Sequence, residues 1–230
     1  MDASPTRVQA GIRGVADILS LKSRRWGGAL WVGCLQFFVA EAIAAADFSG
    51  AYSFRRNYIS DLGAVGCGAG CSPLNALMNA SFVLQGVLIV TGAAVVWALF
   101  PRGALSWLAL GLVAASGLGV ASGLGVALVG LAPEDSAPGW HYLGAAENLL
   151  FCNVGAALFG VALLHEGQAR AVGCLSLVFG LIGLAGLAGL AVGHDFGLGA
   201  GGVERVAAYP FPLWIAGMGA WLIARDDIAD

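Results

Sequence analysis

The sequence predicts an all-α integral membrane protein, a single bundle of six transmembrane helices. Only 11% of its 230 residues are charged, whereas an ordinary soluble domain carries about a quarter, and the mean hydropathy is +0.83. Apolar runs close to the ~20 residues that cross a bilayer also recur along the chain. Because unsatisfied backbone amides are costly in hydrocarbon, we expect these runs to be helices.

The runs place the six spans at residues 26–47, 74–100, 104–131, 141–164, 171–193 and 205–224. They divide the chain into a basic cytoplasmic segment (1–25), the transmembrane domain (26–224) and a short cytoplasmic tail (225–230). With six crossings, most Lys and Arg residues fall on the side of the two termini, and only Arg55, Arg56 and Arg205 fall on the other. The positive-inside rule therefore predicts that both termini are cytoplasmic.

The N-terminal segment is polar and basic and lacks the apolar core of a cleaved signal peptide, so we expect the first run to stay as an anchor. The protein is then a multi-pass protein of the cell (cytoplasmic or inner) membrane. The net charge is only −3, and no Lys/Arg-rich block lies beyond the N-terminus, which excludes nucleic acid as a partner.

Glycine is abundant (36 residues) and concentrated in the third and fifth spans. Gly180, Gly183, Gly186 and Gly189 recur at every third residue of the fifth span, and small residues let helix backbones approach closely. We expect them to pack inside one bundle. A homo-oligomer, or a complex with other membrane subunits, stays open as an alternative.

The polar residues gather in three outward-facing connections, Asp47–Pro73, Ala132–Trp140 and Gly193–Glu204. The first holds Arg55, Arg56, Asn57, Ser60 and Asp61 within seven residues. One interpretation is a loop that closes with its own hydrogen bonds, since Asn and Ser cap helices and Asp suits turns. The other is a polar pocket in which an arginine binds a lipid phosphate while the hydroxyl and carboxylate face the head group.

Cys67 and Cys71 follow in the same connection. A C-x-x-x-C pair that faces an oxidising compartment favours a disulfide, and no neighbouring ligands favour a metal site. The other cysteines lie within spans and are expected to be core residues.

The second connection contains Glu134 and Asp135 and leads to His141 at the start of the fourth span. His141 and Asn148 are seven residues apart and share a helix face, with Glu147 to one side. A carboxyl group at the depth of Glu147 is costly, so it either hydrogen-bonds to another helix, at Asn79 or Gln85, or lines a wet functional cavity. Glu41, near the outer end of the first span, poses the same question.

The third connection contains His194 and ends at Glu204–Arg205. The helix dipole accounts for Glu204 at a helix start. Arg205 lies at the wrong helix end for that dipole and should have a partner, for which Asp61, Glu134 and Asp135 are the candidates.

Three groups of residues together, Asn57–Gly63, Pro133–Asp135 before His141, and Gly202–Arg205, resemble the bacterial family called domain of unknown function 998. More distantly, the Ile59–Gly63 run and the downstream histidine are similar to the family of the damage-regulated autophagy modulators and a GPI-lipid remodelling factor. The resemblance implies a six-helix membrane protein with lipid-related roles in some relatives, and it implies no established catalytic mechanism.

These observations predict a polar pocket at the extracytoplasmic face that binds or handles a membrane lipid head group. Its candidate ligand-binding residues are Arg55, Arg56, Asn57, Glu134, Asp135, Glu147, Asn148 and Arg205. The alternative is a lipid hydrolase or transferase with Ser60, Asp61 and His141 as catalytic residues, where His141 is the base toward Ser60.

A metal held by His141, His194 and Asp61 would be a variant of that alternative, although no specific metal-binding motif supports it. A small-solute or proton-coupled transporter and a structural subunit also stay open. Retinal is excluded because the only lysine, Lys22, precedes the first span.

Overall fold

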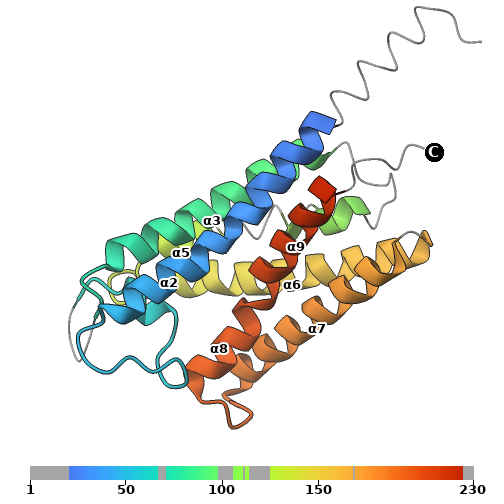
Figure 1. The fold of residues 1–230 in the computed structure, drawn as a ribbon. Coiled ribbons are helices and arrows are strands. Elements are labelled where there is room, and N and C mark those ends of the chain that lie inside the picture. The colour runs from blue at the N-terminus through green and yellow to red at the C-terminus, as the bar shows by residue number, and fades with distance from the viewer. Residues whose placement is uncertain are drawn as a thin grey trace, which may run out of the picture.

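A computed structural model describes residues 21–66, 71–97, 106–110, 112–113, 125–167 and 169–224, and its regular elements in this part of the chain are all helical. In chain order they are the 3-10 helix η1 (Gly33–Leu35), α2 (Gln36–Ala46), the 3-10 helix η2 (Ser60–Gly63), α3 (Asn75–Val96), α5 (Gly125–Leu131), α6 (Pro138–His165), α7 (Arg170–Val192), α8 (Ala200–Ala208) and α9 (Pro210–Ala224). In Figure 1, α2 and α3 lie side by side, and so do α6 and α7.

Five helical segments are long and apolar enough to cross a membrane: Leu21–Ala46, Asn75–Val96, Pro138–His165, Arg170–Val192 and Ala200–Ala224. They correspond to five of the six expected spans, so the all-helical, multi-pass architecture is confirmed. Half of the expected third span, 104–131, falls on residues outside the described part. Within the described half, residues 106–110 and 112–113 are helical and the final stretch forms α5. The count of six spans and the cytoplasmic placement of both termini therefore stay predictions.

The first and second spans pack through one aromatic side chain. Trp31 donates its indole N–H to the carbonyl oxygen of Ile89 at 3.3 Å. Its ring lies where a side chain on Gly92 would be, so the glycine permits the close approach. Five residues further along the first span, Gln36 exchanges hydrogen bonds with Ser81. The two spans are thus held by polar contacts as well as by apolar packing.

The glycines of α7 face the inside of the bundle. A Cβ on Gly180 would lie 2.6 Å from the backbone of α6 at Ala157, and one on Gly186 would overlap the backbone of α8 at Ala207. The opposite face of α7 exposes large aliphatic side chains such as Leu175 and Leu181. The glycine face therefore packs within the chain, as expected.

The last span begins earlier than the sequence predicted, at Ala200 rather than at residue 205, and it is broken between α8 and α9. The break follows from Pro210, which has no N–H to donate to the preceding turn. The early start was missed because Gly199, Gly201 and Gly202 are weak helix formers. Their role becomes clear from the first connection, which docks on them.

Candidate functional site

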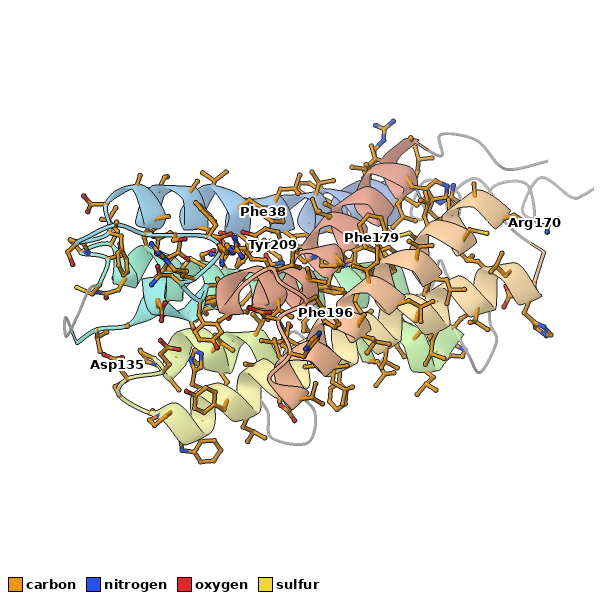
Figure 2. The ribbon with its side chains drawn as sticks, turned by 90° about the horizontal axis from the view of Figure 1, so that it is seen from below. Phe38, Asp135, Arg170, Phe179, Phe196 and Tyr209 are labelled. Atoms are coloured by element: carbon orange, nitrogen blue, oxygen red, sulfur yellow. The ribbon has the colours of Figure 1, made fainter. Side chains whose placement is uncertain are left out.

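The three polar connections meet at one end of the bundle, which we call the loop end. Figure 2 shows Asp135 at this end and Arg170 at the opposite one. The Arg55 side chain of the first connection donates to the Gly197 carbonyl of the third at 3.1 Å. Ser60 and Asp61 of the first lie beside Glu134 of the second. Segments far apart in sequence therefore converge, as the interpretation of a shared site requires.

A cavity opens beneath these connections, between α2, α3, α5, α6, α8 and α9. It offers about 70 Å³ to the centres of water-sized molecules, enough for several waters. Its wall is mainly apolar and includes Phe37, Phe82, Ile89, Val126, Leu149 and Phe211. The polar side chains that line it are Ser60, Gln85, His141, Asn148 and Glu204.

Arg205 forms a buried ion pair with Glu41 next to this cavity. The Nη2 and Oε1 atoms are 2.9 Å apart, and the side chains are 8% and 3% exposed. The partner is therefore the intramembrane carboxylate of the first span. The three candidates named from the sequence, Asp61, Glu134 and Asp135, were wrong, because α8 turns the guanidinium toward α2 and away from the second connection.

The remaining hydrogen bonds of Arg205 hold the first connection. Its Nη1 donates to the backbone oxygens of Phe54, Asn57 and Gly201, each at 2.9 Å, and its Nη2 donates to the Tyr52 hydroxyl at 2.6 Å. Nε donates to Glu41 and to the hydroxyl of Tyr209. Every guanidinium nitrogen thus has a protein acceptor. We interpret Arg205 as a residue that positions the connection, since a head group would have to displace these acceptors.

The backbone of the first connection caps α8. The carbonyl oxygen of Arg55 accepts from the N–H groups of Gly201 and Gly202 at 3.0 and 3.2 Å, which satisfies two donors that a helix start leaves free. Gly199 has φ +81°, and a Cβ on Gly201 would overlap the Asn57 carbonyl oxygen. Glycine is therefore required where the two segments touch.

The run from Asn57 to Gly63 closes with its own hydrogen bonds. The Asp61 carboxylate accepts from the Tyr58 N–H at 2.9 Å and from the Asn57 side chain at 3.1 Å. Asn79 on α3 donates to the Gly63 carbonyl at 2.8 Å. These contacts agree with the self-contained interpretation for Asn57 and Asp61, whereas Ser60 lines the cavity. The self-contained interpretation thus holds for Asn57 and Asp61, and the interpretation as a lipid-binding pocket stays a prediction.

Two carboxyl groups of the second connection have opposite environments. Burial raises the pKa of Glu134, and the hydrogen bond with Asp61 and the charges of Asp61 and Asp135 raise it further, against a lowering hydrogen bond from Ser60. Desolvation is the largest single influence on the pKa of Asp135 and raises it, but the hydrogen bonds from backbone N–H groups, those of Gly66 and Val65 first among them, together lower the pKa. Glu134 therefore gives up its proton less readily than an ordinary glutamate, and Asp135, which orders the loop, gives it up more readily than an ordinary aspartate.

His141 joins the second connection to the cavity. Its Nδ1 lies 2.9 Å from the Ala132 carbonyl oxygen, and a carbonyl only accepts, so Nδ1 carries a hydrogen. Pro133 has no N–H for the last turn of α5, which explains why an imidazole caps this helix end. The ring is buried and lines the cavity.

The helix-face prediction for α6 is confirmed, because His141 and Asn148 both line the cavity. Glu147 is half-buried, is not among the residues that line the cavity and has an interaction partner of its own. Asn79 and Gln85, suggested as its partners, bond instead to Gly63 and Gln36.

The proposed metal ligands are not gathered. His194 is exposed, and its ring lies against Phe196 with centroids 4.8 Å apart. Within the described ranges, no group of three or more His, Cys, Asp or Glu side chains is arranged to hold a metal ion. The set of His141, His194 and Asp61 is therefore not assembled.

Cys71 is disulfide-bonded, and Cys67 lies outside the described residues, so their pairing stays a prediction. Cys71 also ties the ends of the first connection together, because its N–H donates to the Ser49 hydroxyl at 3.0 Å. Arg56, in the same connection, is exposed.

Sequence reasoning missed two contributors, Tyr52 and Tyr209, and it named Gln85 only as a partner for Glu147. Arg205 and Tyr209 are four residues apart and thus share a helix face, which was a usable signal. Nothing local to Tyr52 or Gln85 indicated their partners, which come from other segments.

The fold and site define a class: a multi-pass membrane protein of helices with a polar-mouthed cavity at its loop end. The profile of the family described as "Protein of unknown function (DUF998)" matches residues 31–221. The chain therefore belongs to this family. No curated protein and no solved structure matches it, and the more distant resemblance to the autophagy-modulator family stays a prediction.

Proposed function

We propose that the protein binds a membrane lipid, with part of an acyl chain in the cavity and the head group at the loop end. The observation that carries this proposal is the composition of the cavity wall. Aromatic and aliphatic side chains form most of it, and polar side chains from separate segments gather at its mouth. Ligand sites are commonly apolar concavities with a few placed polar groups.

The polar groups assigned to the head group are Ser60, His141 and Glu204, which line the cavity, with Glu134 beside Ser60. Arg55 and Arg56 are exposed on the first connection. These two arginines contact lipid phosphates at the surrounding membrane surface, because exposed guanidinium groups attract anionic head groups there. Arg205 and Asn57 hold the connection in place.

The loop end is proposed to face the extracytoplasmic side of the cell membrane. The distribution of Lys and Arg supports this orientation. The disulfide at Cys71 also supports it, since disulfides persist in oxidising compartments.

The test is photochemical. Purified protein is incubated with a phospholipid that carries a photoactivatable, alkyne-tagged acyl chain, irradiated, and analysed by peptide mass spectrometry. Ala145 lines the cavity and its neighbour Ala146 is exposed, so Ala145→Trp fills the cavity while Ala146→Trp is a matched control. We expect labelling on the cavity face of α6 that Ala145→Trp abolishes and Ala146→Trp retains. Equal labelling of both variants would refute the proposal.

A second candidate function is a lipid hydrolase, favoured by one observation: Ser60 and His141 line the same cavity. In that reaction the Ser60 hydroxyl attacks an ester carbonyl while a neighbouring base takes its proton, and the ester C–O bond breaks as the alcohol leaves with that proton. Water then hydrolyses the acyl-serine, which releases the acid and restores Ser60. Reaction with a tagged fluorophosphonate, lost in Ser60→Ala, is the expected result. If the wild-type protein binds lipid but does not react with the fluorophosphonate, the hydrolase candidate is refuted and only the lipid-binding function remains.

A further inference from the structure

Among the residues that the structure describes, those at the cavity mouth include carboxyl groups but no matching cation. Glu204 lines the cavity, and Glu134 and Asp61 lie next to its Ser60. The buried cation on the same helix, Arg205, is already paired with Glu41. The mouth is therefore electrostatically complementary to a positively charged group.

The other charged side chains near the mouth do not change this balance. Arg55 is exposed, and its guanidinium donates to the Gly197 carbonyl. Asp135, from the second connection, is exposed and accepts from backbone N–H groups. Its charge adds to the negative side. A cationic ligand group would hold the carboxyl groups in their ionised form.

A second, independent observation points to a ligand in the cavity. Gln85 is 4% exposed, its side-chain oxygen accepts from Gln36, and its amide nitrogen has no hydrogen bond to the described residues. This nitrogen is not fully enclosed by protein atoms, so it faces the cavity that Gln85 lines. Asn148, on the cavity wall, also makes no side-chain hydrogen bond within the described part of the chain.

The two amides lie deeper than the carboxyl groups. Gln85 is six residues along α3 from Asn79, which contacts the first connection, and this corresponds to about 9 Å. Asn148 is seven residues, or about 10 Å, along α6 from His141. The cavity thus has an acidic mouth, an amide layer below it and an apolar floor around Ile89 and Cys152.

We infer that the ligand is an aminolipid: an amphiphile with a primary ammonium at the acidic mouth and a carbonyl or hydroxyl linkage at the amide layer. A primary ammonium has three donors, which match the carboxyl and hydroxyl oxygens of Glu204 and Ser60. An amide N–H₂ such as that of Gln85 donates to the oxygen of an ester, amide or alcohol. This inference rests on the proposed function, because it assumes that lipid occupies the cavity.

The experiment is competition against the photoactivatable lipid in full-length protein in nonionic detergent. The competitors of equal acyl composition are phosphatidylethanolamine, phosphatidylcholine and phosphatidylglycerol. Dodecylamine and dodecanol form a second, phosphate-free pair. We expect phosphatidylethanolamine or dodecylamine to compete at concentrations at least about tenfold lower than their partners without a primary amine, as the loss of a charged hydrogen bond predicts. If dodecylamine competes and phosphatidylethanolamine does not, the ligand is a simple long-chain amine. If both compete, the site also accepts aminophospholipids.

Glu204→Gln should abolish this preference while cavity labelling persists. Glu134→Gln should also abolish the preference, and it leaves intact the hydrogen bond that the Glu204 carboxylate accepts from the Ile59 N–H. Glu166→Gln, an exposed carboxyl that follows the far end of α6, is the control and should behave as wild type.

Equal competition by all lipids, or tighter competition by phosphatidylglycerol, would overturn the aminolipid inference and leave the lipid-binding proposal standing. Labelling that Ala145→Trp does not remove would instead overturn the proposed function itself.

Discussion

Glu41 and Arg205 are 164 residues apart in the chain and form a buried ion pair with 2.9 Å between charged atoms. The pair joins the first span to the last one. Through the other donors of Arg205, it also fixes the connection that covers the cavity.

Removing one member of this pair should destabilise the fold. Glu41→Gln leaves the guanidinium buried without a counter-charge, for which we expect a loss of about 3–5 kcal/mol. The measurement is the free energy of unfolding in detergent micelles. Arg56→Gln, at an exposed arginine, should change it by less than about 0.5 kcal/mol. Similar values for the two variants would show that the pair is not structural.

A methyl group at Gly201 should disturb the docking of the first connection on α8. Gly201→Ala would place a Cβ against the Asn57 carbonyl oxygen, whereas a Cβ at Gly217 in α9 meets nothing within 4 Å. We expect a lower thermal midpoint for the first variant. Gly217→Ala should be neutral or stabilising, because alanine favours an exposed helix position by about 1 kcal/mol. The reverse order would contradict the described contact.

The two carboxyl groups of the second connection should give stability opposite dependences on pH. The folded-state pKa of Glu134 lies above its ordinary 4.5, so its contribution is complete below that value and is lost as the pH rises through the folded pKa. The folded-state pKa of Asp135 lies below its ordinary 3.8, so its contribution is present above 3.8 and is lost as the pH falls through the folded pKa.

Thermal midpoints between pH 3 and 8 provide the check. Relative to wild type, Glu134→Gln should gain stability as the pH rises. Asp135→Asn should be least stable relative to wild type at neutral pH, where the charged hydrogen-bond acceptor is missing. Parallel curves for all three proteins would rule out both assignments.

The orientation is tested by labelling of introduced cysteines in intact cells, in a background where Cys174, which is exposed and the only exposed free cysteine among the described residues, is replaced by serine. A membrane-impermeant maleimide should label Arg56→Cys and spare Glu166→Cys until the membrane is opened. The opposite pattern would place the loop end in the cytoplasm.

Composition and hydropathy were enough to predict the helical architecture, because spanning length and low charge depend on the bilayer and not on partners. The shared face of His141 and Asn148 was also predictable, since it follows from helix geometry. The partner of Arg205 was not. Glu41 and Asp61 are equally acidic in the sequence, and only the docking of α8 against α2 decides between them.

The glycines at residues 199, 201 and 202 misled the prediction of the last span for a related reason. Alone they disfavour helix, but the Arg55 carbonyl caps two of their N–H groups, and that contact exists only after the first connection has folded. The cavity was likewise unpredictable in detail, because its wall combines side chains from six α-helices and from η2.

The central claim is that lipid occupies the cavity, and the most direct measurement is the amount of lipid that stays with gently purified protein, determined by mass spectrometry. We predict a defined lipid in wild type and in Ala146→Trp that is strongly depleted in Ala145→Trp. Equal lipid in all three proteins would contradict the claim.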